Sequence, residues 1–162
     1  MSSCVFPGSF DPITCGHMDI IHRASVIFDQ VTVAVMINRE KKGFIPFEER
    51  VRILKKACCK LGNVKIDMWD GLLAEYMKIH SESIIVRGVR SAAEFEQEKA
   101  AASINKRLYP NIETILLPSC DTAGAISSSV IREIASFGGN YHGMIPECVY
   151  DDIEIWLKLL KH

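Results

Sequence analysis

The sequence predicts an α/β fold class: a single Rossmann-like domain over residues 1–162, with a five-stranded parallel sheet and helices on both faces. Short apolar runs rich in β-branched residues alternate with helical runs along the whole chain. This alternation is typical of a parallel sheet that is covered on both sides. The chain is 48% apolar and 24% charged, which is enough apolar material for a substantial core. No internal repeat, low-complexity tract or linker divides it.

Five short apolar segments are expected to form the strands of this sheet. Most of them are bounded by Gly, Pro or polar residues, as buried strands usually are. In chain order they are residues 3–6, 31–36, 64–68, 83–87 and 112–117. Crossovers between parallel strands are right-handed, and ligands of such sheets bind beyond the carboxyl ends of the strands.

The first two helices are predicted from apolar spacing and from residues that favour helix starts. The buried face of the first helix is predicted to hold Ile20, Ile21, Ala24, Ile27 and Phe28. The second helix is expected to begin at Pro46, with Glu48 and Glu49 favourably placed in its first turn. Its predicted buried residues are Val51, Leu54, Ala57, Cys58 and Leu61, and residues 62–63 end it.

Four further helical segments complete the pattern. A short helix is expected over residues 72–80. A long one should begin with a capping box, Ser91 to Glu94, run to about Leu108 and end before Pro110. The last two are predicted over residues 128–137 and 148–160.

Composition excludes several classes of protein. The net charge is −1 and no basic stripe occurs, so we expect no nucleic-acid partner. No apolar run approaches the length of a membrane span and no signal peptide is present, so we expect no membrane partner and a cytoplasmic location. The six cysteines form no C-x-x-C pair and no zinc-finger spacing, so free thiols are expected. They are Cys4, Cys15, Cys58, Cys59, Cys120 and Cys148.

The turn over residues 7–17 is the most informative segment. It has the sequence PGSFDPITCGH and connects the first strand to the first helix. A helix start offers unpaired N–H groups and the positive end of the helix dipole, which together favour phosphate. Gly16 permits a close approach of the backbone to a ligand, and His17 can donate a hydrogen bond to a phosphoryl oxygen.

Three more groups of phosphate-binding type follow strands of the predicted sheet. They are Lys41–Lys42, Arg87–Arg90 and Ile126–Ser129. Taken alone, each also fits an ordinary role: a solvated loop, a strand end facing solvent, or a helix N-cap. Because all four groups fall on one edge of the sheet, we expect them to form one phosphate site. Neither a Walker A sequence nor a G-x-G-x-x-G sequence is present.

These motifs resemble those of bacterial phosphopantetheine adenylyltransferases. Thr14–His17 is similar to the (H/T)-x-G-H signature of nucleotidyltransferases, and Pro7–Pro12 matches the block that precedes it in this family. Further similar segments occur in the expected order over nearly the whole chain. They are Phe47–Arg50, Arg87–Arg90, Phe95–Glu98 and Ile126–Glu133.

The resemblance implies transfer of the adenylyl group of ATP to 4′-phosphopantetheine, giving dephospho-coenzyme A and pyrophosphate in coenzyme A biosynthesis. The implied catalytic residues are His17, Lys41, Arg90 and Ser9. The implied phosphopantetheine-binding residues are Ser9, Lys41, Leu73 and Arg87, with Leu72 a poorer match than Leu73. The implied ATP-binding residues are Ser9, Phe10, His17, Gly88, Val89, Arg90, Glu98, Ala123, Gly124, Ala125, Ile126, Ser127, Ser128 and Ser129.

The same resemblance implies Mg²⁺ carried by ATP without a dedicated protein cage, and a homohexamer. The chain departs from the family at Ser9, where threonine is commoner, and over residues 120–125, where aromatic residues are usual. Two alternatives stay open: a related nucleotidyltransferase that uses nicotinate mononucleotide or glycerol 3-phosphate, and a nucleotide-binding or flavodoxin-like module without catalysis.

Cys15 lies at the start of the first helix, beside His17. Positive surroundings lower the pKa of a thiol. One hypothesis is therefore a reactive Cys15 that ATP protects, and the alternative is a small packed side chain.

Overall fold

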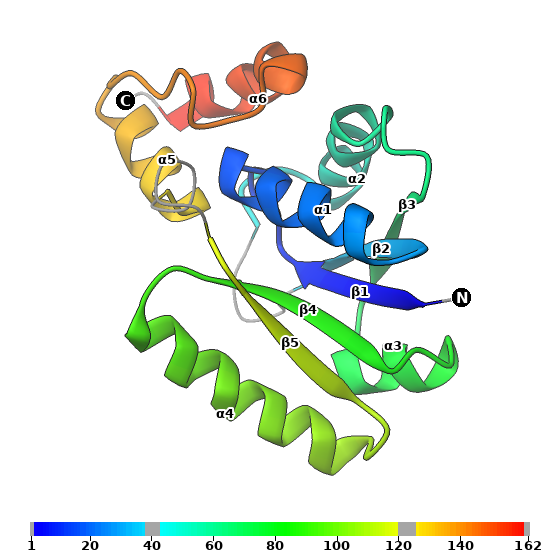
Figure 1. The fold of residues 1–162 in the computed structure, drawn as a ribbon. Coiled ribbons are helices and arrows are strands. Elements are labelled where there is room, and N and C mark those ends of the chain that lie inside the picture. The colour runs from blue at the N-terminus through cyan, green and yellow to red at the C-terminus, as the bar shows by residue number, and fades with distance from the viewer. Residues whose placement is uncertain (1, 38–42, 120–125, 161–162) are drawn as a thin grey trace.

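The computed structural model describes residues 2–37, 43–119 and 126–160. Five parallel strands form one sheet in the order β3-β2-β1-β4-β5, as Figure 1 shows. Their bounds are β1 Ser3–Gly8, β2 Gln30–Met36, β3 Val64–Trp69, β4 Ile84–Val89 and β5 Glu113–Pro118. The predicted five-stranded parallel sheet is therefore confirmed, with each strand within about two residues of its predicted bounds.

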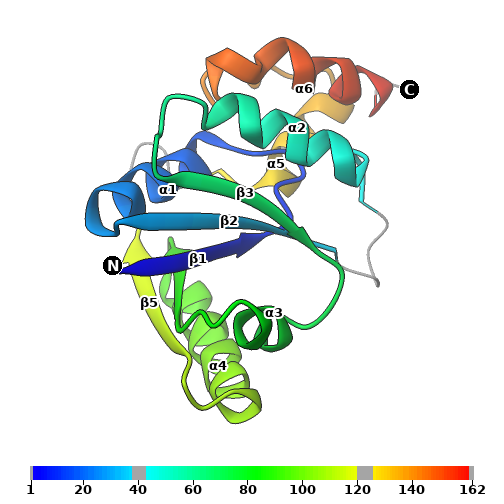
Figure 2. The same cartoon turned by 90° about the vertical axis from the view of Figure 1, so that its right-hand side faces the viewer.

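The helices alternate with the strands as predicted. Their bounds are α1 Cys15–Ile27, α2 Phe47–Ala57, α3 Leu73–Ile79, α4 Ala92–Leu108, α5 Ser128–Ser136 and α6 Tyr150–Leu157. Two short 3-10 helices, Glu147–Val149 and Lys158–Leu160, flank α6. The first two and last two α-helices cover one face of the sheet, and α3 and α4 lie on the other (Figure 2).

Each face of the sheet has its own core. The larger core joins α1, α2, α5 and α6 to the sheet through buried residues such as Phe6, Ile21 and Leu54. The smaller core packs α3 against the opposite face, around Tyr76 and Met77. Helix α4 has no buried residue although it is the longest helix described. Its contact with the sheet near β4 therefore relies strongly on polar side chains.

The strand order reverses between β1 and β4. Strands β1 and β2 are paired from Ser3↔Gln30 to Gly8↔Val35, whereas the register of β1 with β4 consists of Val5↔Ile85. The two strands consequently separate toward their carboxyl ends. Ligands of open α/β sheets bind at this kind of switch point, and the predicted phosphate-binding turns are found beside it.

Several local predictions for α1 and α2 need correction. Ile27 was predicted to be buried but is 57% exposed, because the apolar face of α1 ends at Ala24 and the chain turns at Phe28. Helix α2 ends at Ala57, so Cys58 and Leu61 lie beyond it and not on its buried face. Its buried residues are Arg50, Ile53 and Leu54, while Val51, Ala57 and Leu61 are only partly buried. The helix is rotated so that a charged residue, Arg50, faces inward.

The predicted capping box at the start of α4 is only half present. The hydroxyl of Ser91 accepts a hydrogen bond from the backbone N–H of Glu94 at 3.2 Å. The carboxylate of Glu94 does not return to Ser91; it binds Arg90 instead. A complete capping box occurs at α1, between Thr14 and His17, where no Glu or Gln is present to signal it in the sequence.

Candidate active site

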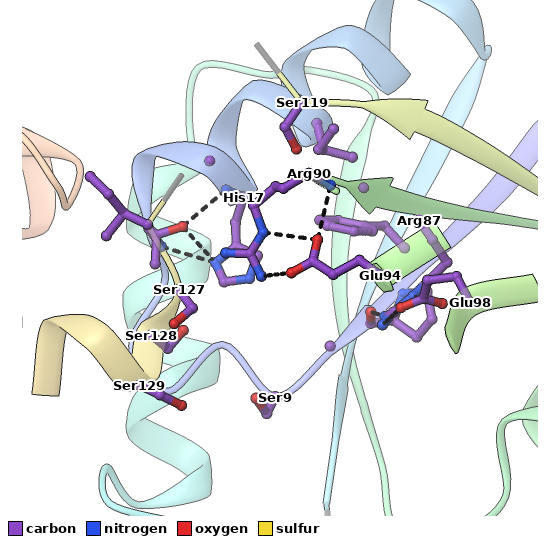
Figure 3. Close-up of a pocket in the computed structure, with 18 of the residues that line it drawn as sticks. Ser9, His17, Arg87, Arg90, Glu94, Glu98, Ser119, Ser127, Ser128 and Ser129 are labelled. Atoms are coloured by element: carbon purple, nitrogen blue, oxygen red, sulfur yellow. Dashed lines mark hydrogen bonds and ion pairs between the residues drawn. The ribbon is translucent and has the colours of Figure 1, made fainter. Parts of the chain in front are cut away.

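A polar cavity of about 360 Å³ opens at the carboxyl ends of β1, β4 and β5 (Figure 3). The starts of α1, α4 and α5 complete its walls. The residues that line it are Phe6, Pro7, Gly8, Ser9, Thr14, Gly16, His17, Ile20, Arg87, Gly88, Arg90, Glu94, Gln97, Glu98, Ser119, Ile126, Ser127, Ser128 and Ser129. Three of the four predicted phosphate-binding groups therefore meet at one place.

The turn after β1 is held in a strained conformation at Phe10. Its φ angle is +47°, in the left-handed region that non-glycine residues rarely adopt. This conformation places the Phe10 ring beneath Gly8, where even a Cβ would lie 2.9 Å from the ring. The ring is 1% exposed and meets the His17 imidazole edge to face, with centroids 5.1 Å apart. Phe10 therefore supports His17 from beneath the turn and does not itself line the cavity.

A buried ion pair fixes the same turn from below. The Asp11 carboxylate accepts hydrogen bonds from the backbone N–H groups of Phe44 and Ile45 at 2.7 and 2.8 Å. Arg50, 8% exposed, lies 3.8 Å from that carboxylate and donates to the carbonyl oxygens of Ile45 and Ser9. This network explains why Arg50 faces inward from α2, since it ties residues 44–45 to the Ser9 turn.

His17 is held as a hydrogen-bond donor toward the cavity. Its Nδ1 accepts the backbone N–H of Thr14 at 3.0 Å, so the proton of the neutral ring resides on Nε2. The pKa of His17 is lowered to about 4, mainly by burial and in smaller part by the nearby Arg87 and Arg90 guanidiniums. At neutral pH the imidazole is therefore uncharged and has one N–H to offer.

Arg87 bridges the gap between the separating strands β1 and β4. Its Nη1 donates to the Pro7 carbonyl oxygen of β1. Its Nε and Nη2 donate to the Glu98 carboxylate of α4 at 2.9 and 2.6 Å. Arg87 thus crosses the switch point and presents its charge at the cavity wall.

Arg90 forms a similar pair with Glu94, one helical turn before Glu98. The Glu94 carboxylate accepts hydrogen bonds from the backbone N–H and Nε of Arg90 at 2.9 and 3.0 Å, and a third from Nη2. These bonds to Arg90 lower the pKa of Glu94, so this carboxylate is ionised at neutral pH. Figure 3 shows both pairs on one side of the cavity, with the serines of α5 across from Arg90.

The start of α5 supplies hydroxyls and backbone N–H groups. Ser127 accepts the N–H of Val130 and Ser129 accepts from Arg132, so both hydroxyl protons remain able to donate. The hydroxyl of Ser128 instead donates to the Pro12 carbonyl oxygen at 2.7 Å. Arg132 also donates to the carbonyl oxygen of Asp11, so α5 and the Ser9 turn form one unit.

A second, more apolar cavity of about 490 Å³ lies on the other side of Arg87. Both cavities are lined by Pro7, Gly8, Ser9, Arg87, Gln97 and Glu98. The rest of the second cavity is lined by Met36, Ile37, Leu73, Ile85, Ala101, Ala102, Asn105 and Thr114. The arrangement can hold a phosphorylated group at Arg87 with an apolar arm extending toward Leu73.

Most of the sequence-predicted site residues are found at these two cavities. Ser9, His17, Arg87, Gly88, Arg90, Glu98 and Ile126–Ser129 line the polar one, and Leu73 lines the apolar one. Phe10 and Val89 do not line either cavity, and Leu72 is exposed. Lys41 and Ala123–Ala125 lie outside the described residues, so their predicted roles stay predictions.

Sequence analysis missed several residues of the polar cavity, notably Glu94, Gln97 and Ser119. Ser119 directly follows β5, so the rule that placed the other groups at strand ends could have found it. Glu94 was assigned to helix capping, and no feature of the sequence indicates that its carboxylate turns to Arg90.

The hypothesis of an activated Cys15 is not supported. Burial raises the pKa of its thiol, and the nearby Cys148 adds to this effect. Cys15 does not line either cavity, and its backbone N–H is bound to the Met144 carbonyl oxygen at 2.9 Å. The prediction that Cys15 lies at a helix start is confirmed. Its burial and the nearby Cys148 nevertheless favour the neutral thiol.

Among residues 2–37, 43–119 and 126–160, no group of three or more His, Cys, Asp or Glu side chains could hold a metal ion. The two carboxylates of the polar cavity are both bonded to arginines. The arginines, hydroxyls and helix N–H groups of the cavity suit phosphate oxygens. In the same part of the chain, no helix is both long and apolar enough to cross a membrane.

Residues 5–134 match a family model described as cytidylyltransferase-like. A phosphopantetheine adenylyltransferase of Clostridium kluyveri is 42% identical over 153 residues, which cover 94% of this chain and 93% of the relative. The enzyme of the same name from Heliobacterium modesticaldum is 43% identical, with coverages of 92% and 89%. That of Finegoldia magna is 43% identical over 93% of each chain. The chain therefore belongs to the phosphopantetheine adenylyltransferase family of cytidylyltransferase-like proteins.

Proposed function

We propose that the protein transfers the adenylyl group of ATP to 4′-phosphopantetheine, forming dephospho-coenzyme A and pyrophosphate, a step of coenzyme A biosynthesis. One observation carries this proposal beyond family membership. A polar cavity of phosphate-binding type and an apolar cavity share the wall formed by Ser9 and Arg87. That geometry suits two phosphorylated substrates whose reacting phosphates meet at the shared wall.

ATP is assigned to the polar cavity. Arg90, with the hydroxyls and first N–H groups of α5, would hold the β- and γ-phosphates, since helix starts and guanidiniums both favour phosphate oxygens. Gly88 also lines this cavity and packs closely against Ile20, whose side chain would lie 2.9 Å from a Cβ at position 88. We also assign Ala123–Ala125 and the backbones of Phe10 and Val89 to the ATP site, as the family resemblance implies.

Phosphopantetheine is assigned to the apolar cavity. Its phosphate would lie at Ser9 and Arg87, and its arm would extend along Leu73. Lys41 is assigned to the same phosphate and to the α-phosphate of ATP. The rim of the cavity near α4 adds Asn105, an amide that can pair with the amide groups of such an arm.

The reaction needs positioning more than proton transfer. An oxygen of the acceptor phosphate attacks the α-phosphorus of ATP, a new P–O bond forms, and the bond to the β-phosphate oxygen breaks with its electron pair leaving on pyrophosphate. The nucleophile is already an anion, so no general base is required. The Nε2–H of neutral His17 would donate to the α-phosphate oxygens as charge develops there, and Arg90 would stabilise the departing pyrophosphate.

Magnesium is expected to arrive with ATP and to stabilise the negative charge of its phosphate oxygens. The described residues that line the cavity would support it indirectly, by orienting the phosphates that bind it. We also propose that residues 1–162 act as one nucleotidyltransferase domain, in the cytoplasm and as a homohexamer. The exposed apolar residues of α4 and β5, among them Phe95, Ile104 and Ile115, are consistent with burial between subunits.

The proposed activity is tested by incubating the protein with ATP, Mg²⁺ and 4′-phosphopantetheine and measuring the products by mass spectrometry. We expect dephospho-coenzyme A and one equivalent of pyrophosphate. Parallel reactions with nicotinate mononucleotide and glycerol 3-phosphate should give no adenylylated product. Turnover of either alternative acceptor in preference to phosphopantetheine would assign a different transferase. Nucleotide binding without any pyrophosphate release would indicate a module without catalysis.

A further inference from the structure

The two arginines of the polar cavity are each neutralised by a carboxylate of the same helix. Arg87 is bonded to Glu98 and Arg90 to Glu94, and these glutamates lie four residues apart on α4. His17 is uncharged at neutral pH because its pKa is about 4. The charges of the described residues that line the cavity therefore sum to zero, although the proposed function places a triphosphate there.

Glu94 is the more exposed of the two carboxylates, and its contacts are concentrated on one residue. The three hydrogen bonds it accepts all come from Arg90: one from the backbone N–H, and two from Nε and Nη2, which occupy that edge of the guanidinium. The side chains of Arg90 and Glu94 are 33% and 30% exposed, so both are in contact with solvent at the mouth of the cavity. A phosphate that binds Arg90 must therefore share the guanidinium with Glu94 or displace it.

Two physical effects of Glu94 oppose each other. By holding Arg90 it reduces the disorder of a long side chain, which favours phosphate binding. By placing a negative charge beside the phosphate site it repels the ligand. The free energy that an exposed ion pair contributes to ordering a side chain is small. It is typically well below the repulsion between an anion and a unit negative charge a few ångströms away. The repulsion should therefore dominate.

From this geometry we propose that Glu94 is a specificity-determining residue that keeps the cavity from retaining free polyphosphate. Its carboxylate occupies Arg90 when the cavity is empty and returns to Arg90 when pyrophosphate leaves. ATP can tolerate this competitor because its nucleoside makes further contacts, whereas pyrophosphate has only its charge. The inference rests on the proposed function, because it assigns the β- and γ-phosphates to Arg90.

The test is the affinity of the protein for magnesium pyrophosphate, measured by isothermal titration calorimetry on Glu94→Gln and on the unchanged protein. Glutamine keeps the size of the side chain and removes its charge. We expect the variant to bind pyrophosphate roughly tenfold more tightly, the factor for one unit charge several ångströms away at a dielectric constant between those of water and protein. The inhibition constant of pyrophosphate in the forward reaction should fall by a similar factor.

Two control variants separate this effect from damage to α4. Glu96→Gln removes the same charge from the same helix, but Glu96 is paired with Lys99 and does not line the cavity, so pyrophosphate affinity should not change. Glu94→Asp keeps the charge and should stay near the affinity of the unchanged protein. A loosened helix would weaken binding, so tighter binding cannot come from a structural defect.

Unchanged or weaker pyrophosphate binding in Glu94→Gln would overturn the inference, because ordering of Arg90 would then be the larger effect. If the protein forms dephospho-coenzyme A, that result leaves the proposed function in place. If the unchanged protein binds neither ATP nor pyrophosphate, the proposed function and this inference both fail.

Discussion

The two cavities on either side of Arg87 differ in the chemistry that they offer to a ligand. The polar cavity offers arginines, hydroxyls and helix N–H groups, each placed by a specific hydrogen bond. The apolar cavity offers mainly aliphatic surface from β2, β4, α3 and α4. The first can fix the position of reacting phosphates, and the second can select an acceptor by the shape of its arm. Changes in the first should therefore affect the rate, and changes in the second should affect acceptor affinity.

The largest effect is expected from His17→Ala. This variant removes the N–H that we propose donates to the α-phosphate, so turnover should fall by roughly 10²–10³-fold while ATP affinity changes little. Steady-state kinetics and ATP titration measure the two quantities.

Two further variants control for the capping role of His17. His17→Gln places at this position the side chain that usually completes a capping box, so α1 stays capped while the imidazole is lost. It should also be slow. His22→Ala, at an exposed position on the same helix, should have normal turnover. Near-normal turnover in folded His17→Ala would remove the role of His17 in catalysis.

The next largest effect concerns which substrate each of the two arginines binds. Arg87 lines both cavities, whereas Arg90 lines only the polar one. Arg87→Ala should mainly raise the KM for phosphopantetheine and Arg90→Ala mainly that for ATP. Each loses a charge-assisted contact of about 2–3 kcal/mol, roughly 30- to 150-fold. If both variants raise the KM of the same substrate only, the assignment of one arginine to each substrate is wrong.

A smaller effect is expected from Leu73→Ala in the apolar cavity. Loss of apolar contact area should raise the KM for phosphopantetheine about three- to tenfold and leave the KM for ATP unchanged. Leu72→Ala is the matched control, since Leu72 is the preceding residue, is exposed and does not line the cavity. An equal response of both variants would show that the arm does not lie along Leu73.

The smallest effect is on stability as a function of pH. The pKa of His17 is about 4 in the folded protein and 6.5 in the unfolded chain, so between these values the unfolded chain binds more protons. The contribution of neutral His17 to stability is therefore fully present above pH 6.5 and is lost as the pH falls toward 4. Urea midpoints should decline over this range more steeply for the unchanged protein than for His17→Gln. Parallel declines would contradict the lowered pKa.

The polar cavity could be predicted from the sequence largely because most of its predicted residues fall in three short segments. Ser9–His17, Arg87–Arg90 and Ile126–Ser129 are short segments that follow strands, and the parallel topology brings such segments together. The apolar cavity could not be predicted in this way, apart from Leu73. Met36, Ile85 and Ala101 come from separate elements, and nothing distinguishes them in the sequence from core residues.

Side-chain orientation was the other limit of sequence analysis. Arg50 is buried although charged residues on helices usually face solvent, because Asp11 and two backbone carbonyl oxygens balance its charge and satisfy its donors. Glu94 turns from its expected capping partner to Arg90. Both choices depend on partners that lie on other loops, which periodicity and capping rules do not take into account.

A crystal structure of the protein with dephospho-coenzyme A bound would test the two-cavity account most directly. The account predicts the adenylyl group in the polar cavity with its phosphate near His17, and the pantetheine arm in the apolar cavity along Leu73, with Arg87 between them. An arm that lies outside the apolar cavity, or an adenylyl phosphate remote from His17, would contradict it.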